Sequence, residues 1–121
     1  AGRRLVLVAH AGRHLAGEDT LIRPADQAAY PDWWIFSMLV RLVFRGAGIG
    51  ERLVRLALEQ AAAEGGERVH LLVSEDNRAA IELYRKMGFQ PSALPVLGRQ
   101  LDAEAGCEGR RRIIMTRTIQ R

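Results

Sequence analysis

The stretch RGAGIGERLVRLALEQ, residues 45–60, places three glycines at alternate positions directly before a run of strong helix formers. Glycine lets a backbone approach a ligand closely and adopt conformations that other residues avoid. The first amide groups of a helix have no partner within the helix, and together with the helix dipole they attract phosphate. A glycine-rich turn that leads into a helix is therefore the arrangement that a phosphate-binding loop requires.

The spacing of these glycines fits neither of two common nucleotide-binding motifs. A Walker loop would continue with Gly-Lys-Ser/Thr, whereas Gly50 is followed by Glu51 and Arg52. A dinucleotide-binding fingerprint has the spacing GxGxxG, whereas the glycines here follow GxGxG. On the glycines alone, a phosphate-binding loop and an ordinary strand–helix turn stay equally open.

The residues on either side of this stretch predict an α/β fold. An apolar run at 33–44 is typical of a strand covered on both faces, and Leu53, Leu56, Ala57 and Ala61 recur at helical spacing, which predicts a helix over 50–64. Further strands are expected within 3–22, around a turn at 11–12, and at 68–74 and 110–119; a second helix is expected at 77–87. Residues 89–101 are expected to be irregular, with room for one strand. The order predicts an α/β sandwich with a mixed sheet.

Composition indicates one globular domain over residues 1–121, with 48% hydrophobic and 26% charged residues. The net charge of +4 comes almost entirely from arginine, since Lys86 is the only lysine. A basic chain can attract anionic ligands or nucleic acid. The arginines are spread along the chain, however, and only 110–112 form a run. Aromatic content is 6% and no nucleic-acid motif appears, so nucleic-acid binding is the weakest interpretation.

The single cysteine, Cys107, forms no intrachain disulfide and no cysteine-based zinc site, which agrees with a reducing, cytoplasmic location. It lies in a glycine-flanked segment expected to be flexible and is not predicted to be a nucleophile. His10, His14 and His70 lack metal-ligand spacing and are expected to be surface or packing residues, so no metal is predicted. The apolar run at 33–40 is far shorter than the roughly 20 residues of a membrane helix, and no membrane association is expected.

A second stretch, SEDNRAAIELYRKMGF at 74–89, follows the next predicted strand. Together the two stretches resemble the GNAT superfamily of N-acetyltransferases, and the resemblance covers most of the chain. The family signature Arg/Gln-x-x-Gly-x-Gly/Ala after an apolar strand is matched by Arg45, Gly48 and Gly50. The later family pattern of Asn, Ala, Leu-Tyr and Gly-Phe is matched in order by Asn77, Ala79 or Ala80, Leu83-Tyr84 and Gly88-Phe89.

This resemblance implies a mixed, mostly antiparallel sheet flanked by helices, with acetyl-CoA as cosubstrate. Backbone groups of Met38 and Val40 would bind the pantetheine arm and the thioester carbonyl, although both residues also fit a buried strand. Asn77 would contact the arm, with a helix cap as the open alternative. The pyrophosphate loop would consist of Arg45, Gly46, Ala47, Gly48, Ile49 and Gly50.

The resemblance also implies the catalytic chemistry. Tyr84 falls where many members place the acid that protonates the leaving thiolate; the alternative is a core aromatic residue. A tyrosine stays protonated at neutral pH and can donate a proton. Many members carry a glutamate base on the strand before the loop, but 33–40 contains no acid. Glu75, Glu18 and Asp19 remain as candidates, with Glu75 taken as the base, although each is more typical of a solvated surface charge.

The chain begins almost at its first hairpin, whereas family members usually open with a strand and two helices that form much of the acceptor wall. A fragment, an open acceptor site and completion by a partner chain in a homodimer stay open, and residues 91–112 are a further source of acceptor or dimer contacts. The sequence predicts transfer of an acetyl group from acetyl-CoA to a primary amine of an unidentified small molecule or protein. The alternative is an acyl-CoA-binding module without turnover.

Overall fold

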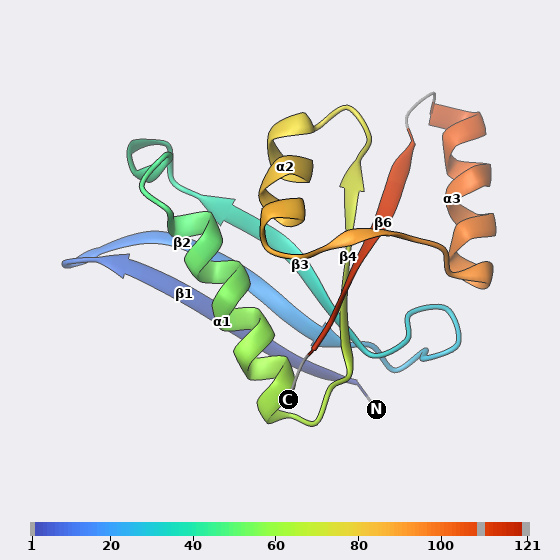
Figure 1. Cartoon of the computed structure of the whole chain (residues 1–121), viewed down its shortest axis with the longest axis horizontal. Helices are drawn as coiled ribbons and strands as arrows, with labels where there is room; N and C mark the ends of the chain where they lie inside the picture. Colours follow the sequence, from blue (N-terminus) through green and yellow to red (C-terminus); the bar gives the residue numbers. More distant parts are fainter. Residues whose placement is uncertain (1, 109–110, 120–121) are drawn as a thin grey trace.

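The computed structural model describes residues 2–108 and 111–119, which form a six-stranded sheet with helices on both faces (Figure 1). The strand order is β1-β2-β3-β4-β6-β5, and every neighbouring pair is antiparallel except β3 and β4. The predicted mixed, mostly antiparallel sheet is confirmed. The elements are β1 Arg3–Ala11, β2 His14–Arg23, β3 Trp33–Val40, the 3-10 turn η1 Leu42–Phe44, α1 Ile49–Ala63, β4 Arg68–Ser74, α2 Arg78–Lys86, β5 Gln90–Ser92, α3 Pro95–Glu108 and β6 Arg112–Thr118.

Helix α1 forms where the helical spacing of apolar residues predicted it. Leu53, Val54 and Ala57 are buried against the sheet, and the predicted bounds of 50–64 differ from the observed ones by one residue at each end. The helix stops at Ala63, and Gly65, two residues later, has a φ of +81° that turns the chain away. The amide of the next residue, Gly66, donates to the carbonyl of Ala61 at 2.8 Å, so the last turn is closed by backbone bonds.

Strands β3 and β4 pair only at their beginnings. Trp33 to Ile35 pair with Val69 to Leu71, and beyond this point the two strands diverge (Figure 1). On its other side β3 carries a bulge, because Thr20 faces Phe36 and Glu18 faces Leu39. Ser37 within the bulge has a φ of +55°. The far half of β3 therefore has no strand partner on the β4 side, where a hollow opens.

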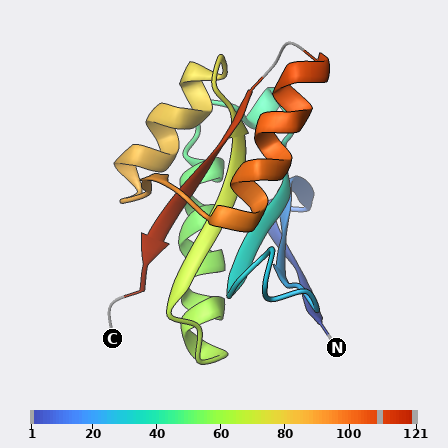
Figure 2. The same ribbon diagram turned by 90° about the vertical axis from the view of Figure 1, so that its right-hand side faces the viewer.

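The two faces of the sheet have separate cores. Helices α1 and α2 cover one face, over a cluster that includes Leu21, Ile35, Leu71 and Tyr84. Helix α3 covers the other face, where Leu97 and Leu101 pack against Trp34 and Ile114. Figure 2 shows α2 and α3 on opposite sides of β4 and β6. The β1 end of this second face is open, and Val6 and Val8 are exposed there.

Two predicted elements were wrong. The strand expected over 33–44 ends at Val40, where its pairing with β2 stops at Gly17; residues 42–44 form η1, with Leu42 and Val43 exposed. The segment 89–101 contains the one predicted strand, β5, but then enters α3. Proline at the first helical position, Pro95, fits a helix start, and the buried Leu97 and Leu101 are four residues apart.

Ion pairs join α3 to the start of β6. Arg111 bonds Asp102 at 2.6 Å, and the guanidinium of Arg112 bonds both oxygens of Glu104 at 2.8 and 2.7 Å. Arg110, the third member of the basic run, lies outside the described residues. Cys107 lies exposed on α3, so its expected placement in a flexible segment was wrong. Among the described residues, each helix is too short or too polar to cross a membrane.

Candidate acetyl-CoA site

Two residues of the glycine-rich loop have positive φ, a backbone conformation that only glycine adopts readily. Gly46 and Gly48 have φ values of +83° and +80°, and a Cβ built on either would meet no atom within 4 Å. L-residues rarely adopt such φ values. Gly48 is also the N-cap of α1. The loop therefore presents bare backbone to an open space, and a side chain at either glycine would enter that space.

The first amides of α1 face the same region. The first helix amide with a partner in α1 is that of Arg52, which donates to the carbonyl of Gly48 at 3.1 Å. The amides of Ile49, Gly50 and Glu51 come earlier and have no partner within α1. The Glu51 carboxylate bonds Lys86 Nζ at 2.6 Å, and this hydrogen bond holds the pKa of Glu51 below its usual value. The negative charge nearest the loop is thus already paired.

These groups line a cavity of about 520 Å³, here called the loop pocket. The Arg45 Nε donates to the carbonyl of Val40 at 3.3 Å, which ties the loop to the end of β3. Helix α2 closes the pocket on the side opposite the loop. The lining residues are Val40, Phe44, Arg45, Gly46, Gly48, Ile49, Gly50, Glu51, Ala79, Ala80 and Leu83.

A second cavity, of about 360 Å³, fills the space where β3 and β4 diverge and is here called the strand gap. Ser37 and Met38 line it from the β3 bulge, and Ser74 lines it from the end of β4. Asn77 and Tyr84 reach it from the start of α2 and from within α2. Ala80 lines both the strand gap and the loop pocket. The two cavities are therefore neighbours on either side of Ala80, one at the loop and one at the bulge.

Most of the predicted site residues line one of these two cavities. Residues 38 and 77 and Tyr84 line the strand gap, and Val40 with the loop residues Arg45, Gly46, Gly48, Ile49 and Gly50 lines the loop pocket. Ala47 and Glu75 line neither cavity. Ala47 bonds the carbonyl of Phe44 through its amide, at 3.3 Å. Glu75 is exposed in the turn after β4, and its amide donates to the carbonyl of Arg111 at 2.9 Å.

Asn77 and Tyr84 line the strand gap and also have structural roles: Asn77 caps a helix, and Tyr84 packs in the core. The Asn77 Oδ1 accepts a hydrogen bond from the amide of Ala80 at 3.2 Å and caps α2. Tyr84 is 8% exposed, and its ring lies 5.9 Å from that of Phe89. Burial raises the pKa of Tyr84, and the nearby charge of Asp19 raises it further. The phenol is therefore protonated at neutral pH, as a proton donor must be.

The sequence-based expectation for Asp19 was wrong. This residue was expected to be a solvated surface charge, but its exposed fraction is 0%. Neither carboxylate oxygen has a hydrogen-bond partner among the described residues, and burial raises the pKa of Asp19 to about 7. The alternation of β2 carries the only available signal, because Asp19 lies two residues from the buried Leu21 and so shares its face.

The histidines are surface or packing residues, as predicted. His10 and His14 are exposed. His70 is buried between a tilted contact with Trp34, at 4.9 Å between ring centroids, and a 2.7 Å hydrogen bond between its Nδ1 and the Thr116 hydroxyl. Burial lowers the pKa of His70. Within the residues described, no three His, Cys, Asp or Glu side chains are grouped as a metal site would require.

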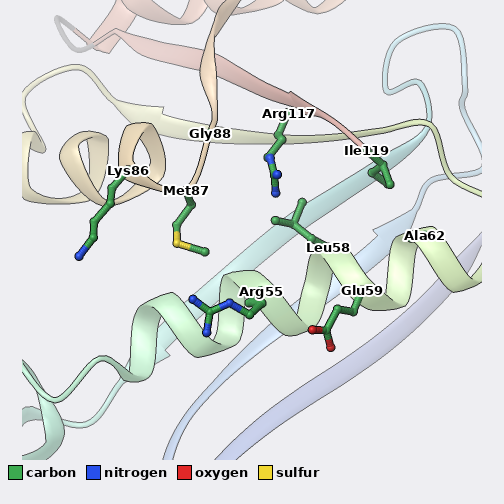
Figure 3. A pocket seen from close by; sticks show the side chains of 9 residues that line it. All are labelled: Arg55, Leu58, Glu59, Ala62, Lys86, Met87, Gly88, Arg117 and Ile119. Atoms are coloured by element: carbon green, nitrogen blue, oxygen red, sulfur yellow. The ribbon is translucent and has the colours of Figure 1, made fainter. Parts of the chain in front are cut away.

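A larger cavity, of about 610 Å³, lies elsewhere, between α1, the end of α2 and β6. We call it the cationic groove. Figure 3 shows Arg117 extending from β6 toward α1, with Leu58 and Met87 between Arg117 and Arg55. Its lining residues are Arg55, Leu58, Glu59, Ala62, Lys86, Met87, Gly88, Arg117 and Ile119.

Solved structures share this fold. The ribosomal-protein-S18-alanine N-acetyltransferase from Escherichia coli superposes with a TM-score of 0.73 at 19% identity, covering 98% of this chain and 71% of that chain. The PaiA N-acetyltransferase from Thermoplasma acidophilum, solved in complex with coenzyme A, superposes with a TM-score of 0.72 at 20% identity, covering 95% of this chain and 60% of that one.

Sequence comparison points the same way. The L-methionine sulfoximine/L-methionine sulfone acetyltransferase of Pseudomonas aeruginosa is 32% identical in an alignment 96 residues long, which covers 71% of this chain and 56% of that protein. Three other curated relatives match over 46 or 47 residues, and these cover only 16–21% of their length. The model of the acetyltransferase (GNAT) family matches residues 5–89, from β1 to the end of the site. The chain therefore belongs to the GNAT acetyltransferase family.

Proposed function

We propose that this protein transfers the acetyl group of acetyl-CoA to a primary amine. The observation that carries the proposal is that the loop pocket and the strand gap adjoin at Ala80, with Tyr84 lining the second. The open space above Gly46 and Gly48 fits a pyrophosphate bound by bare amides. The unpaired far half of β3 offers backbone groups to an amide-containing arm, as a neighbouring strand would.

In the proposed reaction a neutral amine attacks the thioester carbonyl beside the β3 bulge. The carbon–nitrogen bond forms, the carbon–sulfur bond breaks, and the attacking nitrogen loses its second proton to solvent, from which Tyr84 is reprotonated. A backbone amide at Met38 to Val40 stabilises the oxyanion, and the Tyr84 hydroxyl gives its proton to the departing sulfur. Tyr84 lines the strand gap and is kept protonated by burial, which supports this role.

Glu75 is proposed as the group that takes the proton of the ammonium acceptor. It follows Ser74, which lines the strand gap, and it is exposed, so a water molecule would have to link it to the amine. The acceptor is a primary amine of a small molecule or of a protein. The names of the similar proteins include both kinds, an amino-acid analogue and a ribosomal protein. We place the protein in the cytoplasm, where a lone exposed cysteine such as Cys107 stays reduced.

The test is release of free thiol from acetyl-CoA in the presence of a panel of amines: amino acids, polyamines, aminoglycosides and peptides with free N-termini or lysines. The proposal expects amine-dependent thiol release with at least one class, and acetylated product of matching mass. Saturable binding of acetyl-CoA without thiol release for any class would instead support an acyl-CoA-binding module. Absence of binding would overturn both interpretations.

A further inference from the structure

Asp19 is a buried carboxyl group that the proposed reaction leaves unused. It lies on β2 opposite the β3 bulge, because the pairs Thr20–Phe36 and Glu18–Leu39 enclose it. Ser37 and Met38, the two bulge residues across from it, are lining residues of the strand gap. Both oxygens of Asp19 lack a hydrogen-bond partner among the described residues. Burying such a group is costly, and it persists at functional sites more often than in plain cores.

The elements packed over this face explain why the carboxyl group has no counter-ion among the described residues. Asp19 shares the face of β2 with Leu21, which belongs to the core cluster under α1 and α2. Helix α1 turns apolar residues toward the sheet there, among them Leu53 and Val54. Helix α2 supplies the titratable group of this environment, Tyr84, and burial alone accounts for the raised pKa of Asp19. Glu18 projects from the opposite face of β2.

We propose that Asp19 is a positioning residue that acts on acetyl transfer through Tyr84: the charge of the buried carboxyl group sets how firmly Tyr84 holds the proton that it gives to the departing thiolate. This proposal rests on the role proposed for Tyr84 above. Asp19 does not line the strand gap and does not touch the reacting atoms.

The sign follows from Coulomb repulsion. When Tyr84 gives its proton to sulfur, the phenol becomes a phenolate, and coenzyme A leaves as a thiol. A phenolate beside a charged Asp19 places two like charges in a medium of low dielectric constant, whereas a protonated Asp19 adds no repulsion. Asp19 and Tyr84 lie on the same side of the sheet, because Asp19 shares the face of Leu21, and Leu21 and Tyr84 belong to one core cluster. The charge of Asp19 there raises the pKa of Tyr84. Protonated Asp19 therefore makes Tyr84 the better acid, and ionised Asp19 makes it the poorer one.

The coupling is measured first without catalysis, by carbon-13 NMR of the free protein labelled at the tyrosine Cζ. In the wild type the Tyr84 resonance should show an inflection near the pKa of Asp19, about 7, well below its own ionisation. Tyr30, the second tyrosine, is an internal control that should show no inflection. Asp19→Asn should remove the inflection, and Glu18→Gln, a matched neighbour, should keep it. A Tyr84 resonance that is flat through this range, or an inflection that survives in Asp19→Asn, would overturn the coupling.

The second readout is the single-turnover rate as a function of pH, at saturating acetyl-CoA and acceptor. The ratio of the wild-type rate to the Asp19→Asn rate should fall between pH 6 and 8, by up to about tenfold for a one-unit change in the pKa of the acid. A ratio independent of pH, with the NMR inflection present, would show that the coupling does not reach the reaction. If no amine is acetylated, the proposed function fails, while the NMR result still decides the coupling. Asp19→Ala, checked by circular dichroism, serves if the Asn variant does not fold.

Discussion

The candidate site and the cationic groove are both hollows beside α1, but they differ in what lines them. The groove is the larger, at about 610 Å³, and three of its lining residues are cationic side chains, Arg55, Lys86 and Arg117. The loop pocket and the strand gap are smaller, at about 520 and 360 Å³. Each of these has one arginine among its lining residues, Arg45 and Arg112. Their walls also expose backbone: two glycines with positive φ, three helix amides without a partner in α1, and a strand whose neighbour has diverged.

The proposed acetyl-CoA site is therefore assigned from backbone geometry, and not from the size or the charge of a cavity. A cationic side chain can be neutralised by its own chain, as Lys86 is by Glu51, and exposed charges are screened within about 10 Å at ordinary salt. Backbone amides at a helix start stay directed at one place and cost no side-chain entropy when a ligand arrives. The predictions below separate the two hollows by function, beginning with the largest effect.

Tyr84→Phe should produce the largest loss, because it removes the proposed proton donor and little else. General acid catalysis contributes about 10²–10⁴-fold, so the single-turnover rate with a saturating acceptor should fall by that factor while the affinity for acetyl-CoA stays nearly unchanged. Rapid-quench measurement of acetylated product gives the rate. Tyr30→Phe is the matched control, since Tyr30 packs on Trp34 in the α3-side cluster and loses the same hydroxyl. An unchanged rate in a folded Tyr84→Phe variant would make Tyr84 a packing residue.

Asp19→Asn should give an intermediate effect on stability, in addition to the pH-dependent effect on rate described above. The pKa of Asp19 is raised from 3.8 in the unfolded chain to about 7 in the folded protein, so folding takes up a proton between these values. The contribution of Asp19 to stability is therefore most favourable below pH 4 and is lost as pH rises to 7. The unfolding free energy of Asp19→Asn minus that of the wild type should grow by roughly 2–3 kcal/mol between pH 5 and 8. Urea titrations at several pH values measure this difference in unfolding free energy. A difference that does not change with pH would contradict the raised pKa of Asp19 in the folded protein.

The smallest effect is expected in the cationic groove. Arg55→Gln and Arg117→Gln remove the guanidinium groups that flank it (Figure 3). Because neither residue lines the loop pocket or the strand gap, each substitution should change the dissociation constant of acetyl-CoA by no more than about twofold, through long-range charge alone. Calorimetric titration measures this constant. A tenfold loss in either variant would mean that the groove, and not the loop, holds the phosphates.

The sequence predicted the elements that carry their own periodicity or punctuation. Helix α1 followed from its apolar spacing, and the start of α2 followed from Asn77, which does cap it. Helix α3 was not predicted, because Pro91, Pro95 and Gly98 together resemble a loop, and only tertiary contacts with Trp34 and Ile114 show that its leucines form one buried side. Local propensity is overridden there by packing on the second face of the sheet.

The part of the candidate site that depends on residue type, the glycine loop, was predictable from the sequence. The β3 bulge and the buried Asp19 beside it were missed. Only glycine fits the positive φ at Gly46 and Gly48, so the loop was visible in the sequence. The bulge at Ser37 and the burial of Asp19 arise from how β2 pairs with β3. The bulge cannot be read from β3 alone, whereas the alternation of β2 places Asp19 on the face of Leu21 and is the signal that was overlooked.

The most direct test of the site compares two glycines at the two ends of α1. Gly48 and Gly65 have φ values of +80° and +81°, and a Cβ at either meets no atom within 4 Å, so valine strains both positions alike. Only the Gly48 side chain would enter the loop pocket. Calorimetric titration with acetyl-CoA should show binding to the wild type and to Gly65→Val, and a loss of at least about a hundredfold in affinity for Gly48→Val, with both variants folded. Equal affinity in the two variants would contradict the account, because the phosphates would then not lie on the glycine loop.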